Sequence, residues 1–182
     1  MFYKLQNLAR RFSDDTRGSV SVEVAIILPV LLWAFVAMWV FFDAYKTRST
    51  TEKAAFTISD MLSRETGAID DTYLTSAKKL FDLLSRSDSA SGLRVTVVSY
   101  SASQEDYVFK WSQVKGNIDA MTGSDMTDLG EMLPAMSAGE SLIIIETRTT
   151  YDPPLDVGLG TLPMDTFIFT RPRFAPQLIW SS

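Results

Sequence analysis

The chain contains no histidine and no cysteine among its 182 residues. Without imidazole it lacks the side chain best suited near neutral pH to act as a general base, a proton shuttle or a metal ligand. Without thiols there is no cysteine nucleophile, no Cys/His zinc site, no c-type haem attachment and no disulfide. A chain without cysteine is compatible with both reducing and oxidising compartments, so the lack of cysteine does not indicate where the protein is located. An enzyme is therefore the least favoured class of function, and we expect no cofactor and no metal.

Basic residues are also fewer than acidic ones. The 17 Lys and Arg residues stand against 22 Asp and Glu residues, which gives a formal net charge of −5. Proteins that bind nucleic acid need a surplus of cations to neutralise phosphates, so no nucleic-acid partner is expected. The hydrophobic fraction of 46% argues against a disordered chain.

The hydrophobic residues are concentrated in one segment. The run Val24–Phe42 holds no charge, and extending it back to Ser19 adds a single one, at Glu23. At about 1.5 Å per residue, a helix over this extended segment measures roughly 36 Å, enough to cross a hydrocarbon core of about 30 Å. Core helices of soluble proteins seldom stay apolar on every face over such a length. The sequence therefore predicts a transmembrane helix over residues 19–43, with membrane lipid as a partner.

The residues around this segment predict its orientation in the membrane and its retention in the mature protein. Residues 1–18 carry four basic side chains against two acidic ones. By the positive-inside rule such a short basic leader stays in the cytoplasm, and the rest of the chain is exported. The apolar run exceeds the roughly 7–15 residues of a cleaved signal peptide. It also lacks a small-x-small exit, because Phe35 and Phe42 precede Ala37 and Ala44 by two positions.

A short motif joins the leader to the apolar run. It reads Arg17-Gly18-Ser19-Val20-Ser21-Val22-Glu23. This resembles the class III prepilin processing site, at which a membrane aspartate peptidase cuts after a glycine that follows a basic stretch. In that family a glutamate is the fifth residue of the mature chain, and Glu23 is fifth counting from Ser19. A glycine at the cut presents an uncluttered, flexible backbone. The alternative is that Glu23 simply lies at the headgroup level.

The longer segment RGSVSVEVAIILPVLL resembles the N-terminal signature of TadE/TadG-like proteins, minor-pilin-like (pseudopilin) components of tight-adherence (Flp-type) pilus systems. The matching positions are Arg17, Gly18, Glu23, Ala25 and Pro29. The resemblance covers about 25 residues. It implies a pilus assembly component in the inner membrane of a bacterium, with its C-terminal domain in the periplasm or outside, or in the fibre itself. Its implied partners are a prepilin peptidase, other pilins or pseudopilins and the pilus assembly platform.

The chain also departs from related patterns. The major Flp pilin is very short and has Tyr after the glutamate, where this longer chain has Val24. Ordinary type IV pilins usually begin with Phe, and here the first mature residue is Ser19. TadG-like relatives often carry a much larger extracellular domain. These departures favour a minor component. A single-pass anchored sensor or adaptor domain without processing stays open as the alternative.

Three further residues have two interpretations each. Pro29 removes one helix hydrogen bond and predicts a kink, either as a local bend without a role or as an aid to subunit packing. Arg171 and Arg173 flank a proline in a compact basic patch of an acidic domain. They are either a solvated strand end that pairs with nearby acids or a subunit contact.

The exported part begins with more helix. Apolar residues at positions 54, 55, 58, 61 and 62 recur at helical spacing, and Asp60 and Arg64 can pair at i,i+4. We therefore expect an amphipathic stalk over 44–66 that ends at Gly67. A second helix should start near Asp71-Thr72, either of which can cap it. Its apolar face is formed by Tyr73, Ala77, Leu80 and Leu84, with Leu74 and Phe81 beside them.

After a loop over 87–92 the hydrophobic period changes to two. Alternation over 93–97 and over 107–111, with a polar turn at 103–106, predicts a hairpin. A buried strand follows over 142–151 and a short one over 167–170, which Pro172 ends. Residues 115–139 are irregular, with a short helix near 127–133. Residues 67–182 thus form an extracytoplasmic α+β domain with a small, mostly antiparallel sheet, a pilin-like layout.

One acidic cluster invites a calcium interpretation. With Asp125 as the first residue of an EF-hand loop, Gly130 takes the sixth position correctly. Leu129 and Met136, however, fall where oxygen ligands are required. A helix cap in a solvated loop is the favoured use of these acids.

Overall fold

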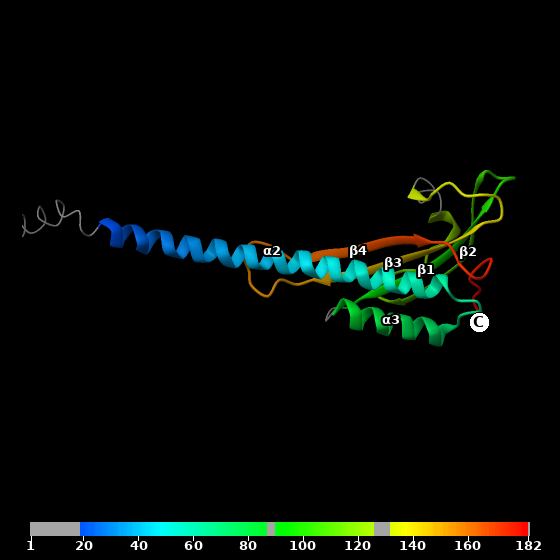
Figure 1. Cartoon of the computed structure of the whole chain (residues 1–182), viewed down its shortest axis with the longest axis horizontal. Helices are drawn as coiled ribbons and strands as arrows, with labels where there is room; N and C mark the ends of the chain where they lie inside the picture. The colour runs from blue at the N-terminus through cyan, green and yellow to red at the C-terminus, as the bar shows by residue number, and fades with distance from the viewer. Residues whose placement is uncertain (1–18, 87–89, 126–131, 182) are drawn as a thin grey trace, which may run out of the picture. The chain divides into compact units, whose positions relative to one another are not determined.

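The computed structural model describes residues 19–86, 90–125 and 132–181. Figure 1 shows the elements in order along the chain. They are α2 (Ser19–Ser63), α3 (Asp71–Ser85), β1 (Gly92–Ser101), β2 (Asp106–Gly116), the 3-10 turn η2 (Gly123–Asp125), β3 (Ser141–Tyr151) and β4 (Leu162–Thr170). The fold is α+β, as predicted.

The chain divides into two compact units. The first comprises Met1–Asp43 together with Pro154–Leu159, and the second comprises Ala44–Pro153 together with Gly160–Ser182. The predicted division of the helix after residue 43 into a membrane segment and a stalk stays a prediction.

The second unit is built on a four-stranded antiparallel sheet of order β2-β1-β3-β4. The hairpin of β1 and β2 turns at residues 102–105, as predicted. The central strand β3 carries Ile145 opposite Val95 of β1 and opposite Ile168 of β4. One row of apolar side chains therefore crosses three strands on one face, which is the pairing that stabilises an antiparallel sheet.

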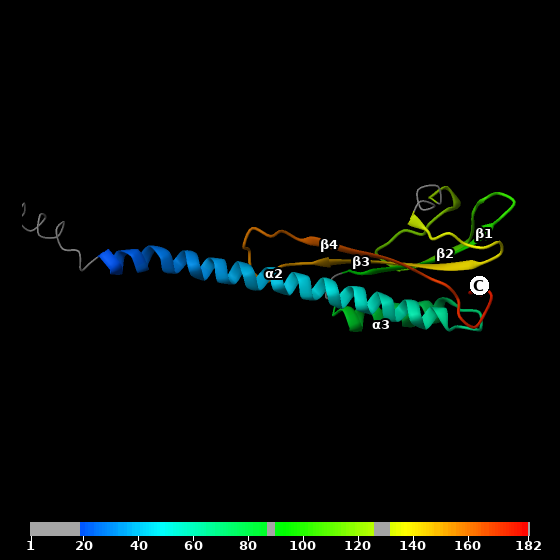
Figure 2. The ribbon, with the colours of Figure 1, turned by 45° about the horizontal axis from the view of Figure 1, so that its top comes forward.

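The main core lies between this face and the helices. Ala54, Ala55, Ile58 and Leu62 of α2 are all buried, as the helical spacing predicted. They join buried residues of α3 and the sheet in one hydrophobic cluster. Figure 2 shows α3 and the C-terminal part of α2 on one side of the sheet. The apolar face of the stalk is thus a core face of the folded unit.

The helix α3 is capped one residue earlier than predicted. Asp70 has an extended backbone, with φ −122°, and its side chain accepts a hydrogen bond from the Tyr73 amide at 2.8 Å. The expected caps, Asp71 and Thr72, are the first two helical residues instead. A cap residue needs a non-helical backbone with its side-chain oxygen within reach of the amide three residues later, and only Asp70 meets both conditions here.

The buried face of α3 also differs at its C-terminal end. Leu74, Ala77 and Phe81 are buried as predicted, but Leu84 is exposed and Ser85 takes the buried position. Ser85 continues the i,i+3,i+4 series of the three buried residues, whereas Leu84 lies on its flank. The prediction at Leu84 was wrong because the buried face is centred on Leu74, Ala77 and Phe81, and Tyr73 and Leu80 are only partly buried at its edge.

Two element boundaries were also misjudged. The helix α2 ends at Ser63, short of the stalk expected over 44–66, and Gly67 does not terminate it. The Ser63 carbonyl accepts a hydrogen bond from the Arg173 amide at 2.7 Å, so a distant segment caps this helix. The strand β4 starts at Leu162, five residues before the expected Phe167. Pro163 fits there because β4 is an edge strand, where a missing N–H is tolerated.

Some predictions fall in part on residues outside the described ranges. The loop predicted over 87–92 includes 87–89, and its last residue, Gly92, is already in β1. The helix predicted near 127–133 lies largely within 126–131, and so do Asp128, Gly130 and Glu131 of the acidic cluster. These expectations stay predictions.

The C-terminal segment returns to the start of α3. Ile69 forms a parallel bridge with Trp180, through hydrogen bonds of 2.9 Å to the Ile179 carbonyl and 2.8 Å from the Ser181 amide. The Trp111 indole donates to the Leu178 carbonyl at 3.2 Å, and Leu178 is buried in the main core. The last residues of the chain are therefore part of the folded unit.

We expect Asp70→Ala to lower the free energy of unfolding by about 1 kcal/mol, because it removes the acceptor for an otherwise unsatisfied helix amide. Thr72→Ala is the matched control, since Thr72 is exposed and was an expected cap that the structure does not use. It should change stability by no more than about 0.5 kcal/mol. Urea unfolding of the chain in detergent, followed by tryptophan fluorescence, measures both. Equal losses would contradict the assignment of Asp70.

Candidate functional site

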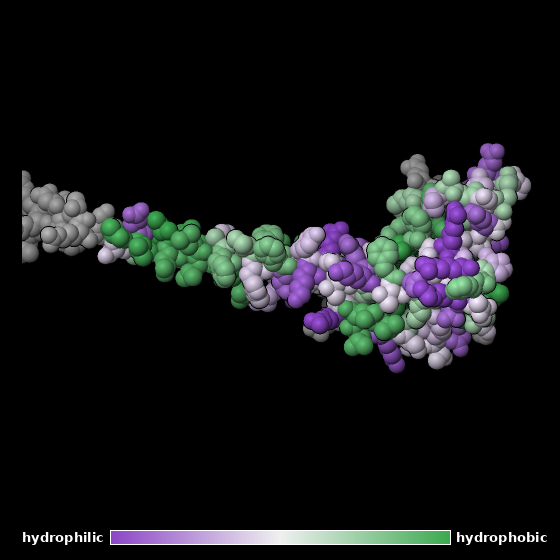
Figure 3. Space-filling view, viewed as in Figure 1, coloured by the Kyte–Doolittle hydropathy of each residue, from purple (hydrophilic) through white to green (hydrophobic). Residues whose placement is uncertain are grey.

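The first candidate site is the apolar segment of α2. Large hydrophobic side chains are exposed along it on all sides, and Figure 3 shows hydrophobic residues gathered over the N-terminal half of the helix. Among the described residues this is the one helix long and apolar enough to cross a membrane. Soluble proteins rarely expose a continuous apolar surface of this kind, which marks a lipid or protein contact.

The described residues of the predicted processing motif, Ser19 to Glu23, lie in the first turns of the described helix. The described part of α2 begins at Ser19, and Glu23 is exposed one helical turn later. Four residues of helix place Glu23 about 6 Å along the axis from Ser19. Arg17 and Gly18 lie outside the described residues. The helix continues through Pro29 without interruption, and the kink expected there stays a prediction.

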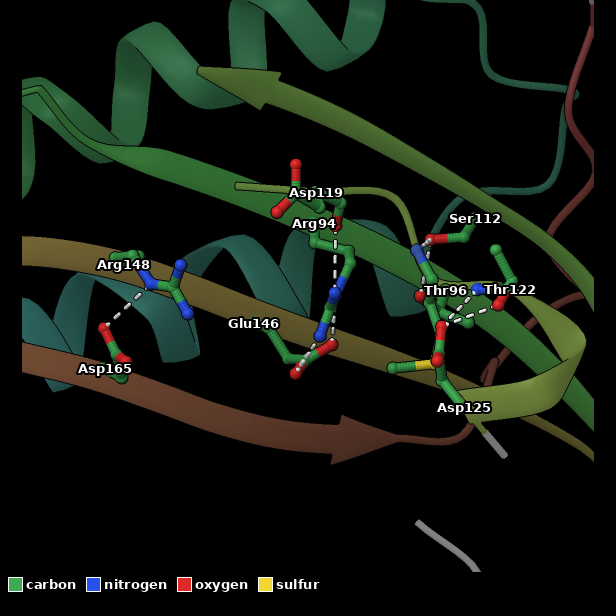
Figure 4. A network of polar contacts seen from close by, with 10 residues as sticks. Arg94, Thr96, Ser112, Asp119, Thr122, Asp125, Glu146, Arg148 and Asp165 are labelled. Atoms are coloured by element: carbon green, nitrogen blue, oxygen red, sulfur yellow. Dashed lines mark hydrogen bonds and ion pairs between the residues drawn. The ribbon is translucent and has the colours of Figure 1, made fainter. Parts of the chain in front are cut away.

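The second candidate is a polar network on the sheet face opposite the helices (Figure 4). Arg94 of β1 stands directly across from Glu146 of β3. Its guanidinium donates to both carboxylate oxygens at 2.6 Å, and it also donates to the Asp119 carbonyl at 2.9 Å. Both charged side chains are less than a fifth exposed. A two-pronged ion pair of this kind is geometrically specific and stronger than a neutral hydrogen bond.

Further hydrogen bonds continue the network toward η2. The Ser112 hydroxyl bonds to Thr96 at 2.9 Å and accepts from the Met121 amide at 3.1 Å. The Asp125 carboxylate accepts two hydrogen bonds of 2.8 Å from the amide and hydroxyl of Thr122. These bonds, together with the charge of Arg94, lower the pKa of Asp125 below its ordinary value. Asp125 thus closes the exposed η2 turn from its last residue, and the expected use of these acids as a helix N-cap stays a prediction.

The contacts of this network have a structural role. A hollow of about 140 Å³ beside it is lined by Arg94, Glu146, Arg148 and Asp165, among others. Its cations are paired with its acids, since Arg148 also lies 3.5 Å from Asp165. The network ties the connection after β2 to the sheet. Across residues 19–86, 90–125 and 132–181, no group of three or more acidic side chains is placed to hold a metal ion.

The basic patch after β4 pairs with acids. Arg171 lies 3.4 Å from Glu140, and Arg173 lies 2.9 Å from Asp60. Asp60 also pairs with Arg64 at 2.9 Å, as predicted from the i,i+4 spacing. All of these side chains are substantially exposed, so each pair contributes at most about 1 kcal/mol. The pairing with nearby acids that one interpretation expected is present, and the choice between a solvated strand end and a subunit contact stays open.

Sequence reasoning missed the pair of Arg94 and Glu146. Alternation placed Arg94 on the face opposite Leu93 and Val95, which is correct. Nothing local, however, relates it to a carboxylate 52 positions later. The motif that sequence reasoning did find rests on the signature around Gly18 and Glu23. Comparison of the chain with family models, with curated proteins and with solved structures finds no match.

Proposed function

We propose that this chain is a minor-pilin-like (pseudopilin) assembly component of a tight-adherence pilus system, held in the inner membrane of a bacterium by the first part of α2. The observation that carries this proposal is the exposed apolar helix over the described part of α2, which follows the Arg17-Gly18 pair in the sequence. Both the length of the apolar segment and its position after a basic leader suit a single span with its N-terminus in the cytoplasm.

The helix acts by packing. Lipid covers the apolar side chains while the chain is in the membrane, and neighbouring pilin helices cover them in an assembly. A charge at the centre of a membrane helix costs roughly 2.5–3.5 kcal/mol, and less near the interface. Glu23 therefore needs a partner once the helix enters an apolar bundle. Cleavage after Gly18 supplies one, because it creates an α-amino group at Ser19 that can meet Glu23 of an adjacent subunit.

The second unit supports this assignment because it is a folded body with its own core. It has its own hydrophobic core, and several of its charged side chains pair with one another. It is thus a folded body carried on the helix, suited to contacts with other subunits and with the assembly platform. The net charge of −5 leaves nucleic acid out of the proposed partners.

The test is N-terminal sequencing of the protein purified from its native host, with the prepilin peptidase present. A mature chain that begins at Ser19 supports the proposal. A mature chain that begins at Met1 would overturn it and leave the alternative of an anchored sensor or adaptor domain without processing.

We expect a reporter fused to the C-terminus to be active only if it is of the kind that works outside the cytoplasm. The reason is the charge of the leader, which holds the N-terminus inside while α2 crosses the membrane. Paired fusions of a periplasm-active and a cytoplasm-active enzyme measure this. Activity of the cytoplasmic reporter alone would reverse the orientation.

A further inference from the structure

Two residues in the apolar run of α2 are covered, unlike their neighbours. Ala37 is 9% exposed and Val40 is 0% exposed, whereas Met38, Trp39 and Phe41 are at least half exposed. Ala37 and Val40 are three positions apart and therefore share one face of the helix. The described residues that share a compact unit with this part of α2 are Pro154–Leu159, from the connection between β3 and β4. The loop and the covered face thus belong to the same compact unit.

The position of that face along the helix gives its depth. The apolar run is bounded by Glu23 and Asp43, the charges before and after it. At about 1.5 Å per residue, Val40 lies about 4.5 Å and Ala37 about 9 Å inside the Asp43 boundary. If residues 19–43 span the membrane, the loop that packs there lies at the outer edge of the hydrocarbon core.

The composition and the backbone conformation of the loop suit a position at the outer edge of the hydrocarbon core. Leu155, Val157 and Leu159 are apolar and partly or largely exposed, and the segment holds no lysine or arginine. Its turn is preformed, because the Asp156 carboxylate accepts a hydrogen bond from the Gly158 amide at 3.1 Å. Gly158 has φ +89°, a conformation that favours glycine. The only acid in the tip is thus engaged in the turn, and Leu155 is presented 48% exposed.

We propose that the Pro154–Leu159 loop is a second membrane contact, which inserts Leu155 into the boundary between headgroups and acyl chains of the outer leaflet. The partner is the lipid surface. The inference rests on the membrane span of the proposed function. Apolar groups at this boundary are typically buried about 5–10 Å, which matches the depth of Ala37 and Val40. Two contacts, a spanning helix and a loop beside it, restrict how the helix can rotate and tilt in the bilayer.

The absence of cysteine makes a direct test simple. Single-cysteine variants of the full chain carry an environment-sensitive fluorophore at Leu155→Cys, at Leu31→Cys within the span, or at Leu83→Cys on α3. Leu83 is 75% exposed and serves as the aqueous control. Each protein is reconstituted in phosphatidylcholine–phosphatidylglycerol vesicles that hold a nitroxide either near the headgroup or deep in the acyl chain.

We expect the label at 155 to lose at least about twofold in fluorescence with the shallow nitroxide, and less with the deep one, because the boundary region lies near the headgroups. The label at 31 should respond more to the deep nitroxide, and the label at 83 to neither. Leu159→Cys repeats the measurement from the other side of the turn, in case the label at 155 disturbs it.

The outcomes separate the loop from the span. If 31 is quenched but 155 and 159 behave like 83, the loop contact is overturned while the span stands. If 31 is not quenched, the span and the loop contact both fail. If 155 is shielded from the nitroxides and also from aqueous iodide, a protein surface covers the loop, and the lipid assignment is overturned.

Discussion

Replacing Gly18 by valine should leave the leader on the chain. The mature protein from the native host should then begin at Met1, because a branched side chain at the cut obstructs the backbone that the peptidase must reach. The variant still inserts in the membrane, since the apolar segment is unchanged. Intact-mass measurement and N-terminal sequencing of the membrane fraction report the result.

Gly67→Val provides the matched control. Gly67 lies in the connection after α2, and a side chain built there meets no atom within 4 Å. Its chain should be processed like the wild type. Normal removal of the leader from Gly18→Val would contradict the assigned cleavage site.

Glu23→Ala should separate processing from assembly. The variant retains the glycine and the basic leader, so we expect it to be cleaved at least in part. It should incorporate poorly into the pilus machine, because the new amine of Ser19 on a neighbour would then lie without its carboxylate in an apolar bundle. Equal incorporation of the cleaved variant and the wild type would show that this pairing is not used.

Phe81→Ala should cost about 3–5 kcal/mol of the free energy of unfolding, which is the usual range for removing a buried ring. Phe81 is among the largest fully buried side chains and packs within the main core of the second unit. Urea unfolding in detergent measures the loss through the fluorescence of Trp111 and Trp180, which lie in this unit.

The matched control is two residues away on the same helix. Leu83 is exposed, and Leu83→Ala should change stability by no more than about 0.5 kcal/mol. A loss below about 1 kcal/mol for Phe81→Ala would mean that α3 does not contribute to the core as described.

The parts of the fold that the sequence predicted are those with a strong local period. The stalk positions Ala54, Ile58 and Leu62 repeat at helical spacing and are buried. The run Leu142–Ile145 has no alternation, and it is buried on both faces because loops cover the face opposite the helices. In each case the residues that carry the signal are within a few positions of each other.

The parts that the sequence did not predict depend on partners far along the chain. The early start of β4 needs β3 beside it, because Pro163 alone suggests that a strand should not include it. The end of α2 is set by the amide of Arg173, and the pair of Arg94 and Glu146 exists only once β1 and β3 are in register. The candidate processing site differs from these features, because all the residues that indicate it are neighbours in the sequence.

The bridge between Ile69 and Trp180 constrains how the chain can fold as it is made. The core cluster that includes Leu62 also includes Ile168 and Leu178, so it joins residues of α2 to residues that follow β3 in the sequence. Synthesis proceeds from the N-terminus, and the apolar face of α2 and the run Leu142–Ile145 therefore emerge before the residues that complete their cover. A chain released early, before β4, would expose β3 as an unpaired edge rich in isoleucine, the kind of strand that promotes aggregation. Folding of this unit is thus complete only after β4 and Leu178, which follow α2 and β3 in the sequence, have been made.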